Sequence, residues 1–291
     1  MEAFLRAQPL IDLHLHSNHS DGTETPSVVV EQAHHHGVRT MALTDHDMTD
    51  GWVEAAAACT AQGMTFIPGM ELTTRGTIGG MHLLCYLFDP ADPTLVAELE
   101  EQQDAREQRA REIVRLLAED YDITWEDVRR HATDDKGFGR PAIGAAMLEK
   151  GHVSTLNEVF TDIVRKGTKY YVPSPGLNIF DAIRLIRQAG GVPVIAHPTG
   201  RSGGVMPKEA LFKLLDAGIG GFELDHRENK NNPEGLAKLW EYARAYDLIV
   251  TGSSDYHGSR KENRPGENTT SAEMLGRIIE QGTGSSPVYP A

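Results

Sequence analysis

Two histidines one residue apart, His14 and His16, lie within a short apolar run that extends from residue 10 to residue 16. Alternate residues of a β-strand point to the same face, so a strand here presents both imidazoles, together with Asp12, on one side. Two neutral imidazoles on one face can bind a divalent cation, although packing or chance would explain such a pair at least as well. The pair becomes informative only if other ligands reach the same place.

Further histidine and carboxylate side chains fall where other predicted strands end. These are Asp45, His46 and Asp47 at the end of 39–45, Glu71 after 64–68, His197 after 192–196, and Asp255 and His257 after 248–251, while His82 opens the strand at 82–88. In a barrel of parallel strands the carboxyl ends converge on one face, where such folds place their sites. Imidazole and carboxylate groups delivered to one rim by so many separate strands indicate a metal centre.

Short apolar runs alternate with helix-like stretches along much of the chain, which predicts an α/β fold with a largely parallel sheet. Predicted helices cover residues 26–37, 179–189, 207–217 and 233–246. The alternation stops in the middle of the chain, where helical segments follow one another at 98–119, 125–131, 141–149 and 155–164. We therefore predict a discontinuous barrel domain at 8–93 and 167–281, a helical insertion at 94–166 that caps the site, and a loosely held tail at 282–291.

Composition narrows the classes of protein that remain. The 291 residues include 42 acidic and 28 basic side chains, a formal net charge of −14, and 40% of the chain is hydrophobic. This excludes a disordered chain and argues against duplex DNA as a partner, because DNA binding needs a concentrated basic surface. No stretch suits a membrane span and no signal peptide is visible, so we expect a cytoplasmic protein with no membrane partner. The sequence gives no indication of an oligomeric state.

The order of these motifs resembles a known family. The matching segments are DLHLHSNHSDG at 12–22, LTDHD at 43–47, PGMEL at 68–72, His82, AHP at 196–198 and SSDYHG at 253–258. In this order they resemble the PHP-domain (polymerase and histidinol phosphatase) metallophosphoesterases, over nearly the whole chain. The resemblance implies a distorted (β/α)7 barrel with two or three divalent metal ions at its mouth.

The resemblance also implies a ligand set. A first ion is held by His14, His16, Glu71 and Asp255, a second by Glu71, His82 and His197, and a third by Asp21, His46 and His257. Nitrogen and oxygen ligands without thiolate suit Mn²⁺, Zn²⁺ or Fe²⁺, of which Mn²⁺ is the first expectation. Two ions that share Glu71 can generate hydroxide from a bridging water, and attack of this hydroxide on phosphorus hydrolyses a phosphate ester.

The predicted insertion adds a narrower resemblance, to the branch of the family that acts on small nucleotides. Its carriers are Gly139, Arg140 and Pro141, then Lys166, Gly167, Lys169 and the segment 171–173. By this resemblance Arg140 clamps a substrate phosphate and assists catalysis, and Lys166 or Lys169 adds a positive charge. Many relatives have His two residues after this arginine, whereas this chain has Ala142, so any role of that histidine is missing.

Two further histidines are candidates for contact with substrate. His19 lies in the loop after the first strand, and His226 follows the strand at 221–224. Either of them, or a water bound to a metal ion, is a candidate for the general acid that protonates the leaving oxygen. Glu223 and Asp225 reach the same rim and are weaker candidates for substrate contact.

The resemblance favours a metal-dependent phosphomonoesterase that removes the 3′-phosphate of nucleoside 3′,5′-bisphosphates, for example converting adenosine 3′,5′-bisphosphate to AMP. The alternative is a 5′-to-3′ exoribonuclease that acts on short RNA or RNA 5′ ends. A histidinol phosphatase and a catalytically silent PHP module are less favoured, the latter because all nine expected ligand positions carry competent residues.

Overall fold

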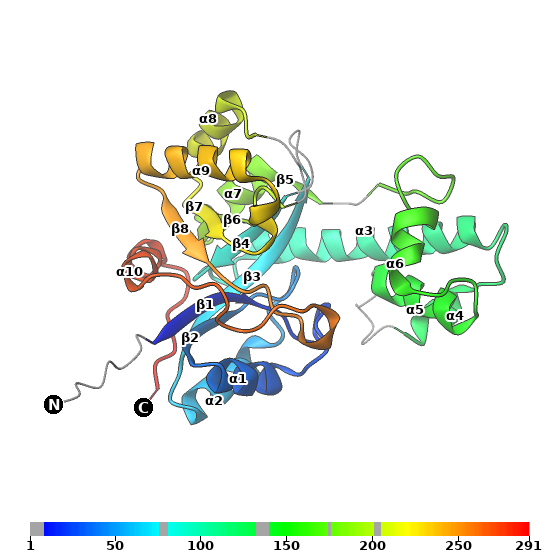
Figure 1. Cartoon of the computed structure of the whole chain (residues 1–291), viewed down its shortest axis with the longest axis horizontal. Helices are drawn as coiled ribbons and strands as arrows, with labels where there is room; N and C mark the ends of the chain where they lie inside the picture. Colours follow the sequence, from blue (N-terminus) through cyan, green and yellow to red (C-terminus); the bar gives the residue numbers. More distant parts are fainter. Residues whose placement is uncertain (1–8, 76–80, 132–139, 174–175, 201–204, 291) are drawn as a thin grey trace. The chain divides into compact units, whose positions relative to one another are not determined.

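The computed structural model describes residues 9–75, 81–131, 140–173, 176–200 and 205–290. By their contacts the residues form two compact units, one made of Met1–Leu95 with Asn178–Ala291 and the other of Val96–Leu177 (Figure 1). Each unit has its own hydrophobic core. No helix in the described ranges is long and apolar enough to cross a membrane.

A single curled sheet organises the first unit (Figure 1). Its seven main strands lie in the order β1-β2-β3-β4-β6-β7-β8. Their bounds are β1 Leu10–Leu15, β2 Val38–Leu43, β3 Thr65–Arg75, β4 His82–Tyr86, β6 Val192–Ala196, β7 Gly221–Asp225 and β8 Ile249–Gly252, and a short β5, Leu177–Asn178, lies off this order. The expected α/β fold with a PHP-type barrel sheet is confirmed.

The sheet is parallel except at β4, which runs antiparallel to both of its neighbours, β3 and β6. This reversal differs from the largely parallel sheet that the sequence suggested. In register, His82 faces Thr73 of β3 on one side and Ala196 of β6 on the other. Because β4 runs backwards, its first residue lies at the rim where the parallel strands have their carboxyl ends. The reversal explains how a histidine that opens a strand joins residues that follow strands.

The two outer strands of the sheet, β1 and β8, are linked through the segment that follows β8. Leu15 forms a parallel bridge with Tyr256, and the amide of His16 donates to the Tyr256 carbonyl at 2.9 Å. At the other end of β1, the amide of Thr270 donates to the Ile11 carbonyl at 2.9 Å. These bonds bring the segment that carries Asp255 and His257 next to the His-x-His strand.

Helices cover the outside of the sheet, as expected when strands are connected by helices. The bounds are α1 Pro26–His35, α2 Trp52–Ala61, α7 Ile179–Gln188, α8 Lys208–Ala217, α9 Pro233–Ala245 and α10 Ala272–Gln281. Helix α1 contacts β2, α2 contacts β3, α7 contacts β6, α9 contacts β7 and α10 contacts β8 (Figure 1). Local signals begin these helices: Thr25 accepts from the amide of Val28 at the start of α1, where Pro26 occupies the first turn.

A core of buried side chains joins the strands of the curled sheet to α10. It contains Leu13, Ala42, Ile67, Leu84, Val194 and Ile249 from six strands, with Ile278 from α10. Tyr86 is fully buried in this core, and its hydroxyl donates to the carbonyl of Leu13 at 3.0 Å. The bond satisfies the polar atom of the ring and ties β4 to β1 across the interior of the curled sheet.

The second unit is helical, as the sequence predicts. Its elements are α3 Pro93–Leu117, which begins in the first unit, α4 Trp125–Arg129, α5 Arg140–Glu149, α6 Leu156–Glu158 and the π-helical turn Val159–Ile163. Ile113, Leu117, Val128 and Met147 pack together in its core. The helical segment predicted at 155–164 therefore consists of the short helix α6 followed by a π-helical turn.

Two features at the end of the chain differ from the sequence-based prediction. Helix α10 was not predicted, although Ser271 accepts from the amide of Met274 at its start. The tail 282–291 was expected to be loosely held, but its amides form strand-like hydrogen bonds. Gly284 and Ser285 donate to the Leu87 carbonyl, and Val288 exchanges two bonds with Phe66 at 2.8 and 2.9 Å. Backbone pairing of this kind does not need the apolar periodicity that sequence analysis searches for.

The contact between β7 and β8 gives a test of the sheet. Gly221 pairs with Ile249, and a Cβ atom at this position would clash with the Ile249 carbonyl oxygen. We expect Gly221→Ala to lower the free energy of unfolding by about 1–3 kcal/mol because the strands must move apart. Gly276→Ala in α10 meets open space and is the matched control. It should be neutral or stabilise the protein by up to about 1 kcal/mol through helix propensity. Urea denaturation measures both, and equal stabilities would contradict the strand contact.

Candidate metal centre

Four side chains on or just after three strands meet at the carboxyl rim of the first unit. Glu71 lies within β3, which continues to Arg75 and does not end at residue 68 as the sequence predicted. The Nε2 atoms of His14 and His16 lie 3.0 Å apart, and each lies 3.2 Å from Glu71 Oε2 and 3.4 Å from Asp255 Oδ1. Ligand atoms about 2.1 Å from one ion stand about 3.0 Å apart in octahedral and about 3.4 Å apart in tetrahedral coordination. The four atoms therefore have the spacing of ligands around one cation.

The Glu71 carboxylate faces two groups of imidazoles, one with each oxygen. Oε2 faces His14 and His16, whereas Oε1 lies 2.8 Å from His82 Nδ1 and 3.2 Å from His197 Nε2. His46 Nδ1 approaches Oε2 at 3.3 Å. A carboxylate that offers one oxygen to each of two imidazole groups has the geometry needed to bridge two ions.

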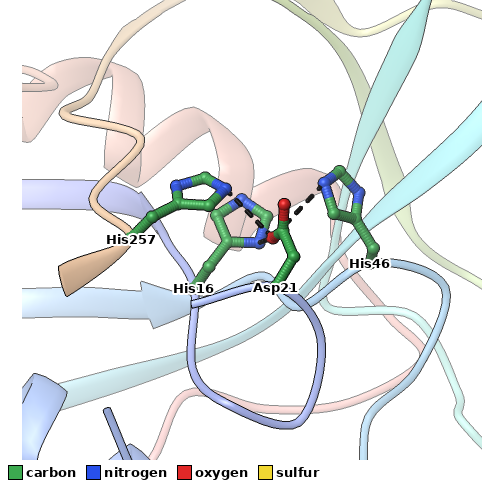
Figure 2. A group of neighbouring side chains, drawn as sticks. All are labelled: His16, Asp21, His46 and His257. Carbon is green, nitrogen blue, oxygen red and sulfur yellow. Dashed lines mark ion pairs between the residues drawn. The ribbon is translucent and has the colours of Figure 1, made fainter. Parts of the chain in front are cut away.

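A third group lies around Asp21 (Figure 2). Asp21 Oδ1 is 3.1 Å from His257 Nε2, 3.8 Å from His46 Nε2 and 3.8 Å from His16 Nδ1. His16 thus directs one ring nitrogen to this group and the other to the group at Glu71 Oε2. The nine side chains predicted to hold metal ions are all brought together in the first unit.

The chemistry of this donor set fits divalent cations. Asp21 Oδ1 and His46 Nδ1 are buried polar atoms that make no hydrogen bond to any described atom. Buried groups of this kind are costly unless a partner satisfies them. The His14 and His16 Nε2 atoms face each other at 3.0 Å with carboxylate oxygens beside them, an arrangement that a cation between the rings would suit. Imidazole and carboxylate donors are those that Mn²⁺, Fe²⁺ and Zn²⁺ accept.

Electrostatics in the metal-free protein show the same demand for positive charge. Burial lowers the pKa of His16, but hydrogen bonds to Asp255 and Glu71 outweigh it and raise that pKa to about 9. Burial lowers the pKa of His14 as well, but the carboxylates around this ring outweigh burial and hold its pKa well above the ordinary value. Burial raises the pKa of Glu71, yet the surrounding imidazoles bring it well below its usual range. Protons on the imidazoles thus supply the charge that ions would otherwise supply.

A second layer of carboxylates positions the ligands. Glu223 is fully buried; its Oε1 lies 3.0 Å from His14 Nδ1, and its Oε2 accepts from the amide of His197 at 2.9 Å. It therefore holds one histidine from each side of Glu71. A carboxylate behind a ligating imidazole fixes the tautomer and orientation of the ring. The sequence had marked Glu223 only as a weak candidate for substrate contact.

Two aspartates fix the loops that carry the ligands. Asp12 accepts from the amides of Ser254 at 3.1 Å and Gly266 at 2.8 Å, which anchors the segment before Asp255 to β1. Asp45 accepts from the amide of Ser17 at 2.8 Å and from the Ser17 and Ser20 hydroxyls at 2.6 Å each. The loop that carries Asp21 is thereby fixed to the end of β2.

Backbone strain is concentrated at the same rim. His197 has φ +27° and Asp255 has φ +54°, values in the left-handed region that non-glycine residues rarely adopt. Each costs on the order of 1–3 kcal/mol and persists only where neighbouring contacts enforce it. Such contacts are the hydrogen bonds that the His197 amide donates to Glu223 and the Ser254 amide donates to Asp12. The strained backbone at these two positions directs the His197 and Asp255 side chains inward.

The remaining predicted residues lie elsewhere or have other partners. Arg140 begins α5 in the helical unit, and its side chain lies outside the described residues. Lys166 is exposed in the same unit. Lys169 is exposed and forms an ion pair with Asp120 of that unit. His19 is half-buried on the loop after β1.

His226 is fully buried behind Asp255. Its Nδ1 accepts from the amide of Glu228 at 3.2 Å, so the neutral ring carries its proton on Nε2. Nε2 has no hydrogen-bond partner among the described atoms and lies 3.8 Å from Asp255 Oδ2. Burial lowers the pKa of His226, which keeps the ring neutral at pH 7. A neutral ring donates a hydrogen bond readily and a proton poorly.

A residue that the sequence analysis missed completes this side of the centre. Lys261 Nζ donates to Asp255 Oδ2 at 2.5 Å, from the loop after β8. No periodic pattern marks a lysine in a loop, so only its short distance along the chain from His257 could have drawn attention to it. A separate cavity of about 520 Å³, between α9 and α10, contains none of the nine predicted metal ligands; Asp225, a weaker candidate for substrate contact, lines it.

Comparisons with known proteins agree with this geometry. The PHP domain family matches residues 12–152. The chain is 31% identical over 270 residues to the 3′,5′-nucleoside bisphosphate phosphatase of Chromobacterium violaceum, with 92% of this chain and 94% of that protein covered. It is 32% identical over 248 residues to a 5′-3′ exoribonuclease of Haemophilus influenzae, with 84% and 89% covered. A crystal structure from Bifidobacterium adolescentis, assigned as a metal-dependent phosphoesterase, matches with TM-score 0.86 at 35% identity over 94% of this chain and 96% of that one.

A curled seven-stranded sheet that gathers imidazoles and carboxylates at one rim defines the class of metal-dependent phosphoesterases. The chain belongs to the PHP-domain family. The resemblance inferred from the motifs is confirmed, and phosphoesterase activity is supported. The similar proteins are named for different substrates, so the comparisons assign the chain to the family and not to one reaction.

Metal binding should release protons. The pKa of His16 is raised to about 9 and that of His14 is raised well above its ordinary value, so this pair of rings holds bound protons in the metal-free protein at pH 7. A divalent ion must displace these protons, so its apparent affinity should increase as the pH rises toward about 9. Stabilisation of the metal-free protein by protonated His16 is complete below its ordinary pKa of 6.5 and is lost through about 9.

Titration calorimetry with Mn²⁺ in buffers of different ionisation enthalpy counts the protons released. We expect net release at pH 7, and less of it from His16→Gln than from the unsubstituted protein. Binding enthalpies that are the same in every buffer would contradict the assigned protonation.

Glu223 should act on metal affinity without touching the ion. We expect Glu223→Gln to weaken binding of Mn²⁺ by about 10- to 100-fold, since the carboxylate behind His14 loses its charge. Glu209→Gln, at an exposed position in the first turn of α8, removes the same charge elsewhere and should leave the affinity unchanged. Equal affinities for the two variants would show that Glu223 has no positioning role.

Proposed function

We propose that this protein is a metal-dependent phosphomonoesterase that removes the 3′-phosphate from nucleoside 3′,5′-bisphosphates. The observation that carries the proposal is the Glu71 carboxylate, with each oxygen facing its own pair of imidazoles. Two cations held in this way suit a group with several anionic oxygens, as in a phosphate ester. The choice of substrate is supported by the 31% identity, over almost the whole chain, to a protein named for this reaction.

We propose that the ions are two or three in number and that Mn²⁺ is the physiological metal, with Zn²⁺ and Fe²⁺ as alternatives. His14, His16, Glu71 and Asp255 would hold the first, Glu71, His82 and His197 the second, and Asp21, His46 and His257 the third. When bound, such ions lower the pKa of a coordinated water and offset the charge of the phosphoryl oxygens.

The protein residues then bind and orient the ester. His226 faces Asp255 with an Nε2–H group that lacks a partner among the described atoms. Because its side chain is fully buried, we assign to it a role in positioning Asp255 and not a contact with the substrate, and its neutral ring is a poor source of protons at pH 7. His19, half-buried on the loop after β1, is the remaining candidate for contact with the substrate.

The helical unit supplies the proposed contacts to the second phosphate. We assign Arg140 as the phosphate clamp and the insertion 94–166 as a cap on the site, with Lys166 as an added charge. Lys169 is the weaker of the two lysines, since its ion pair with Asp120 must exchange before it can bind a phosphate. Substrate with two phosphates would thus be selected over substrate with one.

A phosphate-release assay tests the proposal. The Mn²⁺-loaded protein should release phosphate from adenosine 3′,5′-bisphosphate with kcat/KM about 10- to 100-fold above that for AMP, which lacks one charged contact. Asp255→Asn should lose bound metal and activity together. Asp216→Asn, at an exposed position, removes one charge elsewhere and should change neither. A bisphosphate hydrolysed no faster than AMP, or full activity in Asp255→Asn, would contradict the proposal.

A second candidate, 5′-to-3′ exoribonuclease, is supported by the 32% identity to the protein from Haemophilus influenzae. A 5′-phosphorylated RNA oligonucleotide in the same assay separates the two functions. Stepwise shortening with release of nucleoside monophosphates, faster than phosphate release from the bisphosphate, would favour RNA. The net charge of −14 favours the small substrate, because RNA needs an extended basic track.

A further inference from the structure

Two adjacent basic residues lie on the loop after β8, at the edge of the metal centre. Lys261 Nζ donates to Asp255 Oδ2 at 2.5 Å, and Arg260 Nη1 lies 3.7 Å from Asp21 Oδ2. Both side chains are partly exposed, by 27% for Lys261 and 35% for Arg260. Each cation is therefore open to solvent on one side and in contact with a predicted metal ligand on the other.

The two carboxylates divide their oxygens in the same way. Asp255 Oδ1 faces His14 and His16, and Asp21 Oδ1 faces His257, while the Oδ2 atoms face the two basic residues. His257 lies between them, with Nε2 at 3.1 Å from Asp21 Oδ1 and Nδ1 at 3.3 Å from Asp255 Oδ1. Arg260 and Lys261 thus follow the line of ligands along one side of the centre.

Another basic side chain near this loop, Arg227, has different partners. Arg227 lies 3.4 Å from Glu267 and donates to Asn263 at 3.2 Å, so it ties two segments of the loop together. Such contacts are structural. Arg260 and Lys261 instead pair with carboxylates whose charge an ion would share, which leaves both cations able to interact with an anion that approaches from solvent.

We propose that Arg260 and Lys261 form the binding site for the phosphoryl group of the substrate. Lys261 contacts the phosphoryl oxygen nearest Asp255, and the Arg260 guanidinium contacts a second oxygen on the Asp21 side. Arginine binds two phosphoryl oxygens with a planar fork and lysine binds as a point charge, so the pair covers adjacent edges of one phosphoryl group. This inference rests on the proposed phosphoesterase function, and it adds cations from the first unit to those expected in the insertion.

Binding of inorganic phosphate to the Mn²⁺-loaded protein provides the test. Lys261→Gln and Arg260→Gln should each weaken phosphate binding about tenfold or more, as expected for loss of one charged hydrogen bond. Lys261→Arg should retain most of the affinity. Lys230→Gln, at an exposed lysine of the same unit, removes the same charge and should bind phosphate normally. Titration calorimetry gives the affinity, and elemental analysis gives the ions bound per chain.

The outcomes separate the role in phosphate binding from a purely structural one. Phosphate affinity within twofold of normal in both glutamine variants, with metal content intact, would overturn the inference. If Lys261→Gln loses its ions, Arg260→Gln and Lys261→Arg decide, because neither leaves Asp255 without a cation. Failure of the proposed function has a different result: no phosphate release from any ester by the unsubstituted Mn²⁺-loaded protein, whatever its affinity for phosphate.

Discussion

The buried Glu71 carboxylate is the constraint on which the rest of the centre depends. An ionised carboxylate away from water is very costly unless positive charge compensates it, and here five imidazoles lie within 3.3 Å of its oxygens. The strand that carries it makes this possible. The first part of β3 pairs in parallel with β2 and the later part, with Glu71, pairs antiparallel with β4. Glu71 therefore stands where the direction of the sheet changes. Its Oε2 faces His14 of β1 and His16 directly after it, and its Oε1 faces His82 of the reversed β4 and His197, which follows β6.

A surrounding layer of charge and strain maintains this arrangement. Glu223 links a histidine on each side of Glu71, and Asp12 and Asp45 hold the segments that carry the remaining ligands. The hydrogen bonds of Glu223 and Asp12 also stabilise the left-handed backbone at His197 and Asp255. At the outer edge, Lys261 and Arg260 occupy the second oxygens of two ligands. The centre thus passes from buried carboxylates to imidazoles and then to solvent-facing cations, a gradient that suits an anionic substrate in a chain of net charge −14.

Much of the sheet and of the metal centre could be predicted from the sequence, because apolar strand residues and candidate ligands follow each other along the chain. Apolar runs followed by His, Asp or Glu indicated most of the candidate ligands, and the family resemblance implied the full set of nine, with Asp21, which the fold gathers at one rim. The direction of β4 was not accessible, since a strand reads the same in both directions and only its neighbours fix its sense. Glu223 was misjudged because its partner His14 is distant in sequence, and Lys261 was missed because no periodic pattern marks a lysine in a loop, although its partner Asp255 is only six residues away. Pairing of the tail with Phe66 and Leu87 uses backbone groups that every residue carries.

We propose that Glu71 is shared between two divalent ions, one at each oxygen. Anomalous diffraction at the manganese absorption edge, from crystals of the Mn²⁺-loaded protein, measures this directly. We expect one anomalous peak for an ion bound by Glu71 Oε2, His14, His16 and Asp255. We expect another for an ion bound by Glu71 Oε1, His82 and His197. A single ion on Glu71, or two ions neither of which touches this carboxylate, would contradict it.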